Sequence, residues 1–165
     1  MKKININSKS IRTLSWLIFI VYILALTKVI LFKYSMHMII NIVKENNWTR
    51  FIRRVQHNSN YLPLKNIYQL FFSKGNTMYI VRNIIGNIIA FIPLGTLLPI
   101  LKEKMRKINS ILIASLSISI SFEVIQLLSG IGDFDINDLI LNTSGGLIGL
   151  SLYNFLCRYF IDDCH

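Results

Sequence analysis

Four apolar runs, each close to the length of a bilayer-spanning helix, constrain this chain more than any other feature. They cover residues 13–32, 83–101, 108–128 and 139–157. A helix needs about 20 predominantly apolar residues to cross a hydrocarbon core about 30 Å thick. The chain is 53% apolar and only 16% charged, which is too hydrophobic for an ordinary soluble domain. The sequence therefore predicts an all-α membrane protein, a bundle of about four transmembrane helices.

The first apolar run follows the cations Lys2, Lys3, Lys9 and Arg12, a pattern shared by secretory signals and membrane anchors. Its 20 residues are long for a signal core, so we expect a retained transmembrane helix. The connectors between the later runs are short, so we expect neighbouring helices to be antiparallel. The whole chain, 1–165, is predicted to form a single membrane domain.

A long connector, 33–82, separates the first two spans and mixes Lys and Arg with Trp, Tyr and Phe. Basic residues interleaved with aromatic ones are typical of segments that lie in the membrane interface. We expect this connector to be partly interfacial, with one helix over 41–56.

The charged residues predict an orientation. The connector 102–107 carries four cations, whereas 129–138 carries three aspartates and no cation. Most Lys and Arg within about 15 residues of the spans lie on the amino-terminal side, so both termini are predicted to be cytoplasmic. Counting every Lys and Arg of the connector 33–82 on the opposite side nearly removes this difference. Because the cations lie between apolar spans, the net charge of +10 indicates membrane lipids as partners and no nucleic acid.

Polar side chains interrupt three of the spans at similar depth. A charged group near the centre of a membrane helix costs about 2.5–3.5 kcal/mol, so such residues usually face the bundle interior. Helical spacing aligns them on one face of each span. The sequence predicts a polar pocket near one membrane face, formed by Asn83, Asn87, Glu123, Gln126, Asp135, Asp138 and Asn142. Arg82 and Lys33 are candidate contacts for an anion or a lipid headgroup.

The same residues have a plain structural interpretation. Amide and hydroxyl side chains commonly hydrogen-bond between membrane helices, and Gly145-x-x-x-Gly149 is an ordinary close-packing motif. Pro93 removes a backbone donor in the middle of its span, so a kink is expected there, beside Gly95. A buried Glu near three aspartates is harder to explain by packing alone.

In the order and spacing of five segments the chain resembles the VanZ family of membrane proteins. These segments are 31–33 (LFK), 86–95 (GNIIAFIPLG), 122–126 (FEVIQ), 135–139 (DINDL) and 142–146 (NTSGG). The resemblance implies a multi-pass protein of a bacterial cell membrane that lowers susceptibility to teicoplanin-type glycopeptides without altered peptidoglycan precursors. It also implies a housekeeping role in the envelope for some relatives. Some relatives carry an arginine shortly before the first aspartate, where this chain reads Gly130-Ile131-Gly132-Asp133.

Three classes of function remain open. The first is a protein whose pocket binds a lipid-linked cell-wall precursor, an amphiphile or the glycopeptide itself, with no cofactor. The second is a membrane enzyme in which Glu123, Asp135 and Asp138 hold a divalent metal that acts on a lipid phosphate. No known catalytic motif supports the second class. The third is a transporter or scaffold working as a homo-oligomer, although four spans are few for a transport path.

Overall fold

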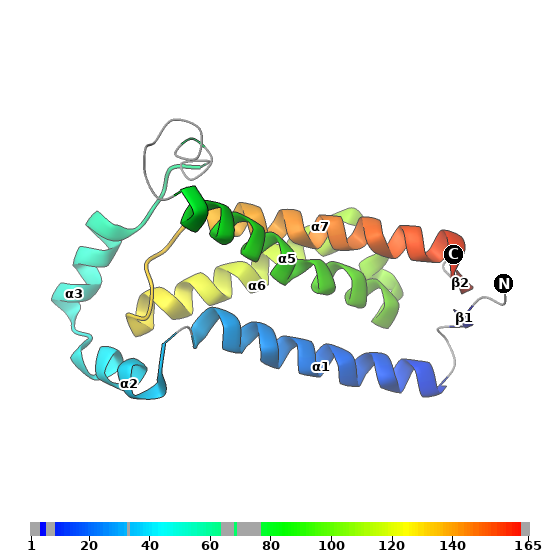
Figure 1. Ribbon diagram of the computed structural model, residues 1–165, viewed down its shortest axis with the longest axis horizontal. Coiled ribbons are helices and arrows are strands. Elements are labelled where there is room, and N and C mark those ends of the chain that lie inside the picture. The colour runs from blue at the N-terminus through cyan, green and yellow to red at the C-terminus, as the bar shows by residue number, and fades with distance from the viewer. Residues whose placement is uncertain (1–3, 6–8, 33, 64–67, 69–76, 163–165) are drawn as a thin grey trace.

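The computed structural model describes residues 4–5, 9–32, 34–63, 68 and 77–162. Four long helices run lengthwise through the molecule (Figure 1): α1 (Lys9–Leu31), α5 (Thr77–Leu101), α6 (Ile108–Ser129) and α7 (Ile136–Tyr159). Each contains a segment long and apolar enough to cross a membrane. The prediction of an all-α bundle with four transmembrane helices is confirmed.

Three of the four helices begin before the predicted spans. α1 begins at Lys9 rather than residue 13, and α5 begins at Thr77 rather than Asn83. α7 begins at Ile136, where the Asp135 side chain accepts a hydrogen bond from the Asn137 N–H and caps the helix. A capped helix end needs no apolar residues in its first turn, so the apolar run is shorter than the helix.

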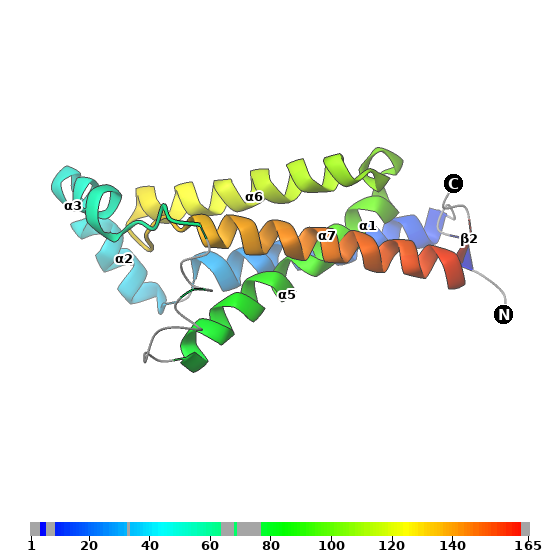
Figure 2. The same cartoon turned by 90° about the horizontal axis from the view of Figure 1, so that it is seen from above.

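α7 lies between α5 and α6 in the view of Figure 2 and packs most extensively on α5. Small residues permit this close approach. A Cβ added at Gly145 would meet the Ile88 carbonyl oxygen, and one added at Gly149 would meet that of Ile92. Thr96 of α5 also donates a hydrogen bond to the Gly149 carbonyl at 3.0 Å. The two backbones therefore touch along the glycine face of α7.

α1 covers the side of the bundle formed by α5 and α6. Its contact with them includes a buried cluster of Leu26, Phe91, Leu94 and Phe122. α5 continues as a helix through Pro93, which has no N–H to donate one turn back. In this region the Tyr22 hydroxyl donates to the Ala90 carbonyl at 2.8 Å, which ties α1 to the proline segment of α5.

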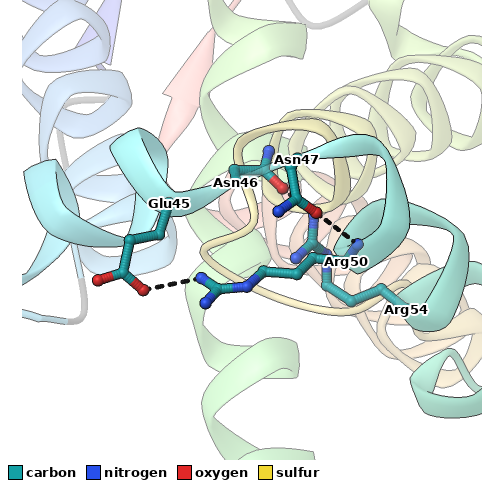
Figure 3. Close-up of polar contacts among 5 residues, drawn as sticks. All are labelled: Glu45, Asn46, Asn47, Arg50 and Arg54. Carbon is teal, nitrogen blue, oxygen red and sulfur yellow. Dashed lines mark hydrogen bonds and ion pairs between the residues drawn. The ribbon is translucent and has the colours of Figure 1, made fainter.

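The described part of the first connector forms three short elements beyond one end of the bundle (Figure 1): α2 (Met36–Glu45), α3 (Trp48–Arg53) and the π-helical turn η1 (Arg54–Asn58). The single helix expected over 41–56 is wrong, because it is interrupted at Asn46 and Asn47. The Asn47 side chain accepts from the Arg50 N–H at 2.9 Å and starts a new helix, as Figure 3 shows. We call this end of the molecule the connector end.

The opposite end, here called the terminal end, holds both ends of the described chain. The two-residue strands β1 (Ile4–Asn5) and β2 (Ile161–Asp162) pair in parallel there. The connection from α5 to α6, which includes the 3₁₀ turn η2 (Glu103–Arg106), lies at the same end (Figures 1 and 2). The alternating directions of the four long helices thus bring both ends of the described chain to the terminal end.

Candidate functional site

A cavity of about 290 Å³ lies between the four long helices in the half of the bundle nearest the connector end. It is bounded by the last turns of α1 and α6, by the first turns of α7 and by residues 82–90 of α5. Six of the seven residues predicted to form the polar pocket line it; Asp135 does not. The full lining consists of Val29, Ile30, Arg82, Asn83, Gly86, Asn87, Ala90, Phe122, Glu123, Gln126, Asp138 and Asn142.

Glu123 is the most buried carboxylate of the site, with 3% of its surface exposed. Its Oε2 accepts a hydrogen bond from the Asp135 backbone N–H at 2.8 Å. A carboxylate among apolar spans is costly unless it is hydrogen-bonded or used, and Glu123 sits one and a half turns inside the end of α6. Its contact with Asp135 joins α6 to the loop that precedes α7.

Two further contacts place amide groups around Glu123. Asn87 Nδ2 donates to Asp138 Oδ1 at 2.6 Å, which joins α5 to α7. Gln126 Nε2 donates to the Ile30 carbonyl at 3.1 Å, which joins α6 to the end of α1. The polar stripes of three helices are therefore brought together, and the end of α1 closes the fourth side.

Asn142 lines the cavity and has one buried side-chain atom without a hydrogen-bond partner among the described residues. It is only 5% exposed, and its Nδ2 donates to Ser119 Oγ at 2.9 Å. Its Oδ1 is buried with no hydrogen-bond partner among the described residues. If the oxygen and nitrogen of the amide exchanged places, the nitrogen would be the atom without a partner. Buried polar atoms are nearly always paired, so this unpaired atom beside the cavity is an exception.

Asp135 has a supporting position instead of the pocket position that the sequence predicted. Its Oδ1 accepts from both nitrogens of Asn137 and from Asn60 Nδ2 at 2.8 Å. Asn60 also pairs through its backbone with Phe134 and Ile136. Asp135 is drawn out of the cavity because it caps α7 and fastens the first connector to the 130–135 loop.

Sequence reasoning did not find the residues that hold this connector. Asn46 Nδ2 donates to the Leu128 carbonyl at 2.7 Å, and Arg54 Nη2 donates to Asn46 Oδ1 at 2.6 Å. Gly130, whose φ of 80° suits a glycine, ends α6 directly beside this pair. Asn46 and Arg54 lie more than 70 residues from the α6 carbonyls that they contact, those of Leu128 and Leu127. Only the Asn46-Asn47 pair, a helix-capping signal, marks the region in the sequence.

The remaining predicted contacts have different outcomes. Arg82 has an exposed side chain and lines the cavity. Lys33 lies outside the described residues. Within the described part of the chain, no three His, Cys, Asp or Glu side chains form a group that could hold a metal ion. The arrangement of Glu123, Asp135 and Asp138 thus gives the metalloenzyme alternative no support.

Four membrane-length helices around a polar cavity define a multi-pass membrane protein. The family model described as VanZ/LLP1 matches residues 19–158, and the chain belongs to this family. Protein VanZ of Enterococcus faecium is 42% identical to it over 72 residues. That match covers 44% of this chain and 44% of the relative, so the chain spans less than half of the curated relative it matches. No solved structure matches the chain significantly.

Proposed function

We propose that the protein lowers susceptibility to teicoplanin-type glycopeptide antibiotics, and that its polar cavity binds a lipid-linked or amphiphilic component of the cell envelope. Membership of the VanZ/LLP1 family and the similarity to protein VanZ support the first part. The second part rests on one observation, the buried carboxylate of Glu123 in a cavity that is also lined by Asp138 and by amide side chains.

The chemistry of the cavity favours a ligand that donates hydrogen bonds. The carboxylates of Glu123 and Asp138 supply hydrogen-bond acceptors in its wall. Hydroxyl or ammonium groups of a headgroup would pair with them, whereas Arg82 can contact an anionic part of the same ligand. Sugar and amino-alcohol headgroups combine these features.

The size of the cavity favours part of an amphiphile over a whole antibiotic as its occupant. Pockets that enclose drug-sized ligands usually measure about 300–1,000 Å³, and this one measures about 290 Å³. It can hold a headgroup or one sugar, with the rest of an amphiphile outside it. The protein would then limit the access of the antibiotic by acting on its surroundings in the envelope.

The orientation that this function needs has the connector end facing outward and both termini in the cytoplasm. The four cations of the connector 102–107 at the terminal end support it. So does the aspartate-containing loop at the connector end, which carries Asp133 and Asp135.

The experiment is expression of the intact chain and of two charge-neutral variants, Glu123→Gln and Asp138→Asn, in a teicoplanin-susceptible Gram-positive host. Both new side chains keep an oxygen for the hydrogen bonds from Asp135 and Asn87 but lose the negative charge. Minimum inhibitory concentrations are measured for teicoplanin and vancomycin. We expect the intact chain to protect mainly against teicoplanin and both variants to lose most of that protection.

Asp133→Asn is the matched control, because Asp133 is an exposed carboxylate near the same end that does not line the cavity. It should protect as well as the intact chain. An epitope tag checks that all variants reach the membrane in equal amounts. Full protection by Glu123→Gln and Asp138→Asn would refute the role of the cavity, and no protection by the intact chain would refute the antibiotic assignment.

A further inference from the structure

A second cavity, of about 450 Å³, lies at the terminal end of the bundle. It is formed where the start of α1 meets the connection between α5 and α6. Its charged lining contains four cations and one carboxylate, and its apolar lining comes from the last residues of α5. The lining residues are Arg12, Ile100, Leu101, Lys102, Glu103, Lys104 and Arg106.

An apolar groove lies beside this cavity, along the part of α1 that follows Arg12. It has a volume of about 230 Å³ and is lined by Trp16, Phe19, Ile20, Ile23 and Leu24. Arg12 of the cavity and Trp16 of the groove are one helical turn apart on α1. Lys102 Nζ also lies 6.0 Å from the centre of the Trp16 ring. A basic cavity at the membrane surface and an apolar groove in the bilayer are thus adjacent.

We propose that these two features form one binding site for an anionic glycerophospholipid. The phosphate group lies among the four cations, and an acyl chain lies along Trp16 and the groove residues of α1. Arg and Lys bind phosphate through charge-assisted hydrogen bonds, and basic pockets between transmembrane helices bind anionic headgroups. Glu103 supplies an acceptor for headgroup hydroxyls. A free phosphate ion would leave the groove unused, so the pairing favours a lipid.

The competing explanation is that these cations only orient the protein by the positive-inside rule. That rule depends on the number of cations on one side of the membrane and not on whether they line a cavity. Lys102 and Lys104 line the cavity, whereas Lys9 and Lys107 lie at the same end and do not. All four have exposed side chains, so their removal should leave helix packing intact.

The test uses the purified full-length chain and two double variants, Lys102→Ala with Lys104→Ala, and Lys9→Ala with Lys107→Ala. Native mass spectrometry measures the retention of phosphatidylglycerol against phosphatidylcholine, with glycerol phosphate as a headgroup without chains. Each cation near an anionic lipid is worth roughly a factor of five in affinity. We expect the cavity variant to bind phosphatidylglycerol about 30-fold more weakly and the control variant to bind it like the wild type.

Three results would overturn the proposal. Equal weakening in both double variants would show that overall charge is responsible. Equal retention of phosphatidylcholine would remove the recognition of an anionic headgroup. Competition by glycerol phosphate as effective as that of the intact lipid would remove the role of the groove. Melting temperatures of both variants without added lipid, compared with the wild type, exclude loss of folding as the cause.

Discussion

Gly86 and Gly95 both lie in α5, but the same added methyl group meets different surroundings at the two positions. At Gly86, which lines the polar cavity, a Cβ has nothing within 4 Å. At Gly95 it would meet the backbone carbonyl of Gly146 in α7. The substitutions Gly86→Ala and Gly95→Ala therefore isolate the helix contact, because the change in side chain and in helix propensity is the same.

The two substitutions are expected to change the melting temperature in different directions. Overpacking a close contact costs about 1–3 kcal/mol, and a backbone carbonyl of a neighbouring helix moves less readily than a side chain. For a chain of this length 1 kcal/mol shifts the melting temperature by about 2–4 °C, so Gly95→Ala should lower it by about 2–12 °C. Gly86→Ala should leave it unchanged or raise it by up to about 4 °C, because alanine favours helix by up to about 1 kcal/mol.

The assay is thermal unfolding of both purified variants in one detergent, followed by the fraction that stays folded on size-exclusion chromatography. Circular dichroism at low temperature checks that both start with the same helix content. A melting temperature for Gly95→Ala equal to that of the wild type would refute the close contact between α5 and α7. An equal loss in Gly86→Ala would refute the open space at the cavity.

Three smaller changes test other contacts. Tyr22→Phe removes the hydrogen bond to the Ala90 carbonyl and should cost about 0.5–1.5 kcal/mol in detergent unfolding; no loss would contradict a role for that bond. Ser119→Ala removes the partner of Asn142 and should cost about 0.6 kcal/mol, with a value above 2 kcal/mol speaking against a simple interhelical bond. Arg54→Ala should speed hydrogen exchange in the 130–135 loop but not in α7, and uniform exchange across both would contradict local docking.

The four spans could be predicted because a bilayer demands long apolar helices, whatever their neighbours. The position of Asn87, Glu123 and Asn142 at one cavity could also be predicted, because antiparallel helices of similar length bring residues at equal membrane depth together. In both cases the membrane fixes the length and direction of the helices, so a local sequence pattern is enough to predict the arrangement in space.

The attachment of the first connector could not be predicted in the same way. Asn60 reaches Asp135 across 75 positions, and nothing in the pattern around either residue specifies the other. The position of Asp135 shows the same difficulty. Its proximity in sequence to Asp138 predicts a shared pocket, but helix capping and a distant amide determine where its carboxylate lies. Such choices depend on tertiary contacts that apolar periodicity does not encode.

The most direct test of the cavity is to fill it from Gly86, where a larger side chain meets open space. The variant Gly86→Leu is compared with Gly86→Ala in the teicoplanin susceptibility assay at equal membrane abundance. We predict that Gly86→Ala keeps most of the protection given by the intact chain and that Gly86→Leu loses it. Full protection by Gly86→Leu would contradict the assignment of this cavity as the functional site.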